Sequence, residues 1–289
     1  MSRRAVLILL LAAVVVTAAV TIHPSNDRDW SLDQAILAHA DIHAPYVTIR
    51  NIRNFSYVTA DRYTPAYYDR TFDLRQLDSA WFFVEPFGKG GAAHTFVSFG
   101  FGPADFVAIS VEIRKEKGES FSAVKGLFRQ YELMYVIGDE RDLVKLRTNY
   151  RNDPVYLYRI RAAPDRLRAM FLGMLQRANE LRREPEFYNT LTNTCTTNLV
   201  RHVNSIAPGR IPFSPSVFFP ASSDHLAWNL GLIDSARTFE ETKTGALIND
   251  RARRFAEDPE FSRKIRSAGF QPAKRRQDAG ATNPRSAGT

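Results

Sequence analysis

Cysteine is nearly absent from this chain, which has one, Cys195, among its 289 residues. A single cysteine excludes an internal disulfide and every zinc site built on several cysteines. Glycine and proline, at 15 residues each, are too few for a collagen-like chain, and the lack of an internal repeat excludes a solenoid. With 44% hydrophobic and 24% charged residues, the composition is typical of a globular protein that buries a core without disulfides.

A concentrated basic surface is also lacking, although the net charge is +8. Residues 271–289 hold four basic residues and one acidic residue, and Arg3 and Arg4 lie at the opposite end of the chain. A nucleic-acid-binding protein gathers its basic residues on one face, so we expect no nucleic-acid partner. Residues 271–289 contain no aromatic or large aliphatic side chain, and we expect them to form a disordered basic tail.

Charge is absent from residues 5–22, which follow Arg3 and Arg4 and precede the polar stretch that begins at His23. This 18-residue run reaches the lower end of the helical spanning range of about 17–25 residues. Small residues at 17–19 would also suit cleavage by a signal peptidase, which would leave a secreted form. In both cases the basic residues stay in the cytoplasm and the rest is exported. We favour an uncleaved anchor over residues 1–28, in a single-pass protein of the inner membrane with its body in the periplasm.

The body, residues 29–270, contains both strand-like and helix-like patterns. Apolar residues at helical spacing predict a helix over 164–183 and a short helix over 32–40, whereas 54–77 has the composition of loop and short strand. The four-residue connection at 102–105 predicts an antiparallel hairpin. Strands are predicted at 46–53, 81–87, 94–101, 106–114, 131–137 and 155–160. We therefore expect an α+β fold in which an antiparallel sheet packs against helices.

Cys195 lies where a helix is expected to begin. The capping types at 192–194 precede an apolar pattern at Leu199, Val200 and Val203, which places Cys195 in the first turn. Free amides and the positive end of the helix dipole stabilise a thiolate there, and a neighbouring imidazolium would stabilise it further. Such a cysteine is suited to nucleophilic acyl transfer. The alternative is a small buried hydrophobic side chain.

A nucleophilic cysteine needs a base, and His94 is the best placed histidine. It opens a predicted strand directly after a glycine-rich segment, and the neighbouring strand offers Ser110, Glu112 and Arg114 on one face. Any of these could orient the imidazole, and Glu112 is the best electrostatic choice because a carboxylate stabilises an imidazolium.

The other histidines are less suitable. His202 lies two turns along the same predicted helix, roughly 10 Å from the cysteine, and cannot reach it. His23 lies at the membrane end, and His225 falls in an expected surface helix. His39 and His43 have only a loose metal-like spacing and are interpreted as exposed polar residues. We expect no metal site and no cofactor.

Several ordered sequence blocks resemble a known family. The blocks are 47–55, 93–101, 110–119, 131–135, 139–142 and 188–197. Together they are similar to the Lnb N-terminal periplasmic domain family of bacterial envelope proteins, over about residues 42–208. This resemblance implies a periplasmic domain related to papain-like folds in circularly permuted order, with the histidine before the cysteine. The namesake activity is N-acylation of bacterial lipoproteins with an acyl chain from membrane phospholipid.

Carried over residue by residue, the resemblance implies that His94 and Cys195 are the catalytic pair and that Glu112 and Arg114 occupy motif positions. We expect Glu112 to complete the catalytic group, and Arg114, Thr194 and Thr196 to contact substrate. The predicted function is a membrane-anchored periplasmic thiol enzyme that transfers acyl groups on envelope phospholipids or lipoproteins. The alternatives are a cell-wall amidase or peptidase, and a non-catalytic envelope binding module.

Overall fold

The computed structural model of the protein describes residues 2, 6, 22–88, 91–214, 217 and 219–266. Most of the predicted anchor and the whole of the predicted tail lie outside these residues. Among the helices of the described part, none has both the length and the apolar character that crossing a membrane requires.

An eight-stranded sheet forms the centre of the fold. Its main path runs β1-β2-β9-β8-β7-β6-β10, and β5 pairs with the remaining edge of β2. The strands are β1 (His39–His43), β2 (Tyr46–Arg53), β5 (Tyr67–Asp73), β6 (Leu77–Pro86), β7 (Ala93–Phe101), β8 (Asp105–Arg114), β9 (Glu132–Gly138) and β10 (Tyr156–Arg159). A separate two-stranded ribbon joins β3 (Ser56–Tyr57) to β4 (Tyr63–Thr64).

The sheet is mixed, so the predicted purely antiparallel sheet is wrong at one pair. Strands β6 to β9 form an antiparallel meander, as the predicted hairpin required. β9 then runs in the same direction as β2, and the two strands pair in parallel at Arg53 and Gly138.

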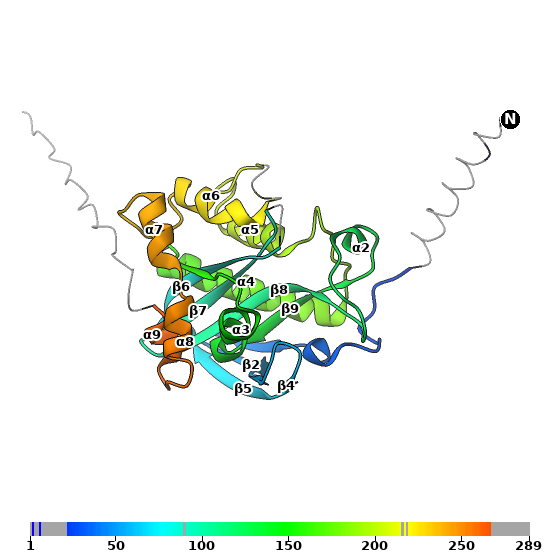
Figure 1. Cartoon of the computed structure of the whole chain (residues 1–289), viewed down its shortest axis with the longest axis horizontal. Helices are drawn as coiled ribbons and strands as arrows, with labels where there is room; N and C mark the ends of the chain where they lie inside the picture. The colour runs from blue at the N-terminus through cyan, green and yellow to red at the C-terminus, as the bar shows by residue number, and fades with distance from the viewer. Residues whose placement is uncertain are drawn as a thin grey trace, which may run out of the picture.

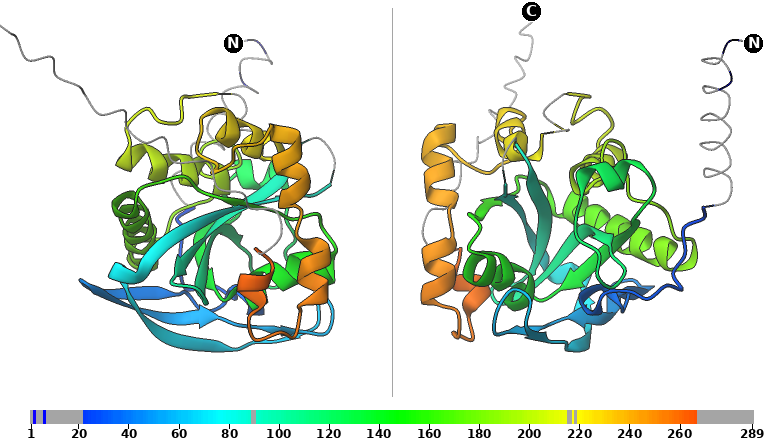
Figure 2. Two further views of the ribbon diagram at one scale, coloured as in Figure 1. Left: turned by 90° about the vertical axis from the view of Figure 1, so that its left-hand side faces the viewer. Right: turned by 45° about the vertical axis from the view of Figure 1, so that its right-hand side comes forward.

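Helices cover both faces of the sheet (Figures 1 and 2). One face packs against α4 (Pro164–Arg183) and α5 (Cys195–Ile206). The other packs against α3 (Glu140–Lys145), the π-helix η3 (Leu146–Arg151), α8 (Asn249–Arg254) and α9 (Phe261–Lys264). The shorter elements are η1 (Leu32–Gln34), η2 (Leu74–Gln76), α2 (Ala123–Leu127), η5 (Pro220–Ser222), α6 (Ser223–Asn229) and α7 (Phe239–Ala246).

Strand alternation explains the two cores. On β7, Phe96 joins the core on the α3 side and stacks on Phe83 with ring centroids 4.3 Å apart. Val97 and Phe99 point the other way, and Phe99 meets Phe171 of α4 at 5.0 Å. Because both faces are buried, apolar side chains occur at consecutive positions along this strand. The prediction of an α+β fold is confirmed.

The structure reproduces the predicted strand 46–53 and helix 164–183, and departs from the prediction near the N-terminus. Residues 32–40 form one 3₁₀ turn and then enter strand β1, not a helix. Backbone groups of Ala40 hydrogen-bond to the amide side chain of Asn179 on α4, at 2.8 and 2.7 Å. Pairing with β2 and this contact from a distant helix outweigh the local helical spacing.

Candidate active site

The predicted helix start is present at Cys195. Thr194 is the N-cap, and its hydroxyl accepts from the amide of Thr197 at 3.2 Å, while the amide of Thr194 donates to the Thr197 hydroxyl at 2.7 Å. This capping box uses the third amide of the helix. The amides of Cys195 and Thr196 belong to the first turn, where helix geometry supplies no acceptor. Cys195 therefore lies in the first turn, at the positive end of α5.

A contact between threonines links this helix start to the strand that carries His94. The hydroxyl oxygens of Thr196 and Thr95 lie 3.2 Å apart, and both residues are buried. Thr95 directly follows His94 on β7. Thr194 and Thr196 thus cap and anchor the segment that carries the thiol. Their predicted contact with substrate stays a prediction.

A pocket of about 380 Å³ brings the predicted catalytic residues together, since Cys195, His94 and Glu112 all line it. Cys195 is 7% exposed. Tyr188 lines the same pocket, and burial together with the neighbouring Cys195 raises the pKa of its hydroxyl. The remaining lining residues are Asp33, Gln34, Glu85, Phe87, Val111, Ile113, Lys115, Phe121, Arg147, Arg151 and Asp153. The pocket therefore has a polar side and an aromatic side.

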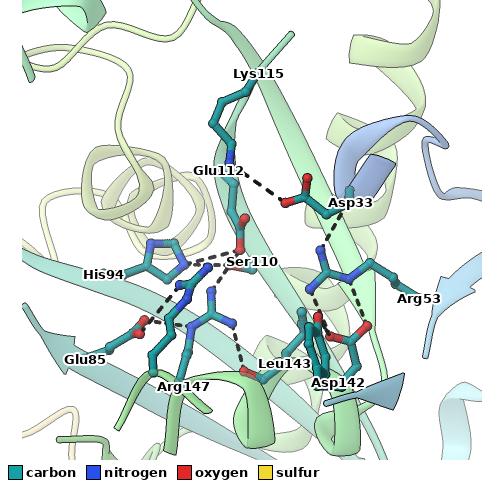
Figure 3. A network of polar contacts seen from close by, with 12 residues as sticks. Asp33, Arg53, Glu85, His94, Ser110, Glu112, Lys115, Asp142, Leu143 and Arg147 are labelled. Carbon is teal, nitrogen blue, oxygen red and sulfur yellow. Dashed lines mark hydrogen bonds and ion pairs between the residues drawn. The ribbon is translucent and has the colours of Figure 1, made fainter. Parts of the chain in front are cut away.

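His94 reaches Glu112 through a serine (Figure 3). Its Nε2 atom lies 2.6 Å from the hydroxyl oxygen of Ser110, and that hydroxyl donates to Oε1 of Glu112 at 2.8 Å. The direct distance from Nε2 to Oε1 is 3.7 Å. Because Ser110 has one hydroxyl proton and gives it to Glu112, Nε2 of His94 must carry a proton and donate to Ser110. Nδ1 is then the unprotonated nitrogen and is the proton acceptor of the ring.

Arg147 fixes the far end of this chain of hydrogen bonds. Its Nη2 donates to Glu112 at 3.0 Å, its Nε to Glu85 at 2.7 Å, and its Nη1 to the carbonyl of Leu143 at 2.8 Å. Glu85 lies opposite His94 in the pairing of β6 with β7. Arg147 and Glu85 are 3% and 2% exposed, so this is a buried ion pair. Figure 3 shows the guanidinium of Arg147 between the two carboxylates.

This environment keeps His94 neutral. Burial lowers the pKa of His94 to about 3, and the positive charge of Arg147 acts in the same direction. Burial alone would raise the pKa of Glu112, but Arg147 and His94 outweigh it and hold that pKa well below its usual range. At neutral pH the pair is a carboxylate and an uncharged imidazole. In this uncharged form the ring keeps a free lone pair, and its low pKa makes it a weak base in the resting pocket.

Arg114 serves the fold and does not line the pocket. Its guanidinium donates to the carbonyls of Gln34 and Ala35, both at 2.9 Å, and to the side chain of Asn26 at 2.8 Å. It also lies 4.1 Å from the ring centroid of Trp30. These contacts attach the segment that precedes β1 to strand β8. The predicted contact of Arg114 with substrate stays a prediction.

The remaining histidines lie outside this pocket. Nε2 of His202 is 2.9 Å from the hydroxyl of Tyr135, on the side of α5 that packs against the sheet. His39 and His43 lie on strand β1, and His225 is exposed on α6. Within the described ranges, no three side chains of the metal-binding types gather in a way that would hold a metal ion.

Sequence reasoning did not identify Arg147, Glu85 or Tyr188 as site residues. Tyr188 stands at the start of one of the family-like blocks, which is a signal that could have found it. Glu85 could have been found by pairing the strand at 81–87 with that at 94–101. Arg147 had no such signal, because its helix carries no motif.

Comparison with known families decides the classification. The model of the Lnb N-terminal periplasmic domain matches residues 63–219, which is more than half of the chain. The chain belongs to the Lnb N-terminal periplasmic domain family. No curated protein and no solved structure matches it. The matched range of the Lnb domain contains His94, Ser110, Glu112, Arg147 and Cys195. Membership in this family indicates a periplasmic protein of the bacterial envelope.

Proposed function

We propose that this protein is a periplasmic thiol enzyme that transfers acyl groups through Cys195. One observation carries the proposal: Cys195 and His94 line one pocket, and Ser110 engages Nε2 of that histidine, so that Nδ1 remains as the proton acceptor. Glu112 orients the imidazole through Ser110.

The proposed reaction has two steps. In the first, Nδ1 of His94 takes the thiol proton as Sγ of Cys195 attacks the carbonyl carbon of an ester. The oxyanion accepts hydrogen bonds from amides in the first turn of α5, and the alcohol leaves with the proton from His94. In the second step an amine attacks the resulting thioester, and His94 takes a proton from the amine. Sγ of Cys195 then leaves and takes back the proton from His94, so that an amide is released and the thiol is restored.

An acyl chain suits the aromatic side of the pocket. Phe87 and Phe121 lie edge to face with ring centroids 6.4 Å apart, and Phe121 is 49% exposed. The same two rings also line an adjoining pocket of about 220 Å³ with Thr194, Val217 and Phe219. A route with apolar walls therefore adjoins the thiol. We propose a phospholipid as acyl donor and a lipoprotein as acceptor, with residues 1–28 as the anchor that keeps the domain at the inner membrane.

We also propose that the fold is papain-like in permuted order. In this chain the strand with the histidine precedes the helix with the cysteine, and the contact between Thr95 and Thr196 joins them. The helix that carries Cys195 packs on the strand that carries His94, as this relationship requires.

The decisive experiment combines a fluorescent phospholipid with a diacylated lipopeptide that has a free amino terminus. We expect transfer of the acyl chain to the lipopeptide and a thioester on Cys195 that hydroxylamine removes. Cys195→Ala should do neither. Cleavage of purified cell wall in a zymogram, without lipid transfer, would favour the amidase or peptidase. A Cys195 thiol that an activity-directed probe labels no faster than a model thiol would favour the binding module.

The membrane anchor has its own test. A reporter that is active only in the periplasm should be active when fused after Thr289, and the fusion should sediment with the membrane fraction. Replacing residues 1–28 by a cleavable signal peptide should release the body in soluble form. A fusion active only in the cytoplasm would overturn both the location and the lipid substrate.

A further inference from the structure

A second, larger cleft lies away from the thiol. It has a volume of about 980 Å³, and neither Cys195 nor His94 lines it. Its walls come from the start of α4, the end of α5 and the segments around residues 207–212 and 230–232, and Figure 1 shows α4, α5 and α6 on one side of the sheet. Apart from Arg161, Arg166 and Arg210, the lining side chains are apolar, and none is a carboxylate.

The three arginines differ in how far they are neutralised. Arg161 pairs with Asp234 at 3.5 Å and donates to the carbonyl of Ser235 at 3.2 Å. The guanidinium of Arg210 donates to the carbonyl of Leu230, and no carboxylate among the described residues pairs with its charge. Arg166 is exposed, and its guanidinium has no acceptor in the part of the chain that the structure describes. Two of the three charges at this cleft are therefore available to an anion.

The floor of the cleft continues into a partly open apolar cavity of about 100 Å³. The cleft and the cavity share five apolar residues, which are Ile160, Met170, Val203, Leu230 and Leu232. The cavity extends under α6 to Leu199 and Thr196, and only Thr196 and Ser223 give its lining a polar side chain. Water needs several polar partners in a cavity, and this lining offers few. The cavity therefore favours an apolar occupant.

We propose that this cleft binds an anionic amphiphile, with its apolar chain in the cavity under α6 and its phosphate or carboxylate head on Arg166 and Arg210. The arginines of the cleft require an anionic head, and the cavity requires an apolar chain. Guanidinium groups form charge-assisted hydrogen bonds with oxyanions. The apolar lining of the cavity suits a hydrocarbon chain. The cleft shares no lining residue with the thiol pocket, although the cavity shares Val217 with the aromatic pocket next to it. The inference does not depend on the proposed acyl transfer.

The test is calorimetric titration of the full chain below the critical micelle concentration of each probe. Dodecyl phosphate and dodecanoate should each bind in a saturable way with about one molecule per chain. The probe with the lower Kd shows whether the cleft prefers a phosphate or a carboxylate head. Inorganic phosphate should not bind measurably, because it lacks the chain. Dodecyl maltoside, which has the chain without the charge, should bind at least about tenfold more weakly.

Variants locate the ligand. Arg166→Gln and Arg210→Gln should each weaken binding of dodecyl phosphate severalfold, and the double variant by at least about tenfold. Arg166→Lys should restore part of the loss. Arg183→Gln is the matched control. Arg183 is exposed at the other end of α4, so this substitution removes the same charge at a position away from the cleft. Its affinity should equal that of the wild type.

Two further variants complete the test. Ala227→Phe should fill the cavity and weaken binding of dodecyl phosphate more than that of hexyl phosphate, with thermal unfolding to verify the fold. Cys195→Ala should bind as the wild type does, whatever becomes of the acyl-transfer proposal. Equal affinity in the wild type and the double arginine variant would overturn the inference. So would equal affinity for the maltoside and the phosphate, or loss of binding in Cys195→Ala.

Discussion

His94 and Ser110 are joined by a short contact in the candidate site, 2.6 Å between Nε2 and the hydroxyl oxygen. The same hydroxyl donates to Glu112 at 2.8 Å, so the carboxylate acts on the imidazole through a serine. This arrangement determines which ring nitrogen carries the proton. A direct bond from Glu112 to Nε2 would assign the same tautomer, but at 3.7 Å that contact is too long for a hydrogen bond.

Replacement of Ser110 tests the relay. Ser110→Ala removes the acceptor of the Nε2 proton, so the ring loses its orientation and both tautomers become populated. We expect kcat to fall by about a hundredfold while KM changes little, because the serine acts through the histidine. Ser110→Thr, which keeps the hydroxyl, should recover most of the activity. Steady-state kinetics with the lipid donor give both constants.

Ser98→Ala is the matched control for this prediction. Ser98 lies on β7 with its hydroxyl buried and without a hydrogen-bond partner among the described residues, so its removal leaves no group unsatisfied. Activity and stability should both be retained. An unchanged kcat in Ser110→Ala would show that the relay has no part in the reaction.

Cys195 and His94 should behave as one unit. Cys195→Ser and His94→Ala should each abolish activity, and the double variant should be no worse than either single variant, since neither residue works without the other. His202→Ala should retain activity, because that ring is engaged with Tyr135 and lies outside the pocket. Multiplicative losses in the double variant would contradict a shared step.

Local sequence signals predicted the elements that carry the site. The threonines before Cys195 predicted the helix start, and the capping box at Thr194 is present. Alternation and a short connection predicted the hairpin that sets His94 beside Ser110. Each of these signals lies within a few residues of the group that it positions, and short-range patterns are what a single sequence records.

The remaining features depend on contacts between distant segments. Arg147 reaches Glu85 and Glu112 across 62 and 35 positions of the chain, and no spacing rule connects them. The sequence favoured a thiolate next to an imidazolium, whereas burial beside Arg147 makes the neutral imidazole the stable form. Strand β1 likewise depends on Asn179, which follows it by 139 positions. Such partners are found only when the chain is folded.

The pKa of His94 gives a prediction on pH. Its folded-state pKa is about 3, below the ordinary value, so the folded protein does not take up the proton that the unfolded chain binds below about pH 6.5. His94 therefore costs stability as the pH falls from about 6.5 towards 3, and its ring stays uncharged at pH 5. In NMR spectra of histidine-labelled protein, assigned by comparison with His94→Ala, the ring of His94 should not titrate between pH 8 and 5. In denaturant it should titrate near about 6.5. A native midpoint near 6.5 would contradict the burial argument.

Arg147 should be the most costly side chain of the site to replace. It is 3% exposed and pairs with two carboxylates, so Arg147→Met would leave Glu112 without this ion pair and Glu85 with only the long contact to Arg151. We expect a loss of about 3–5 kcal/mol in the free energy of unfolding, measured by urea denaturation. Arg151→Met is the control: its side chain is 45% exposed and lies 3.9 Å from Glu85, so the loss should stay below about 1 kcal/mol. Adding Glu85→Gln to Arg147→Met should recover part of the loss, because one stranded charge is removed. If Arg147→Met were as stable as the wild type, the ion pairs of Arg147 with Glu85 and Glu112 would not stabilise the fold. Arg147 would then not be the residue that holds Glu112 in place for the relay.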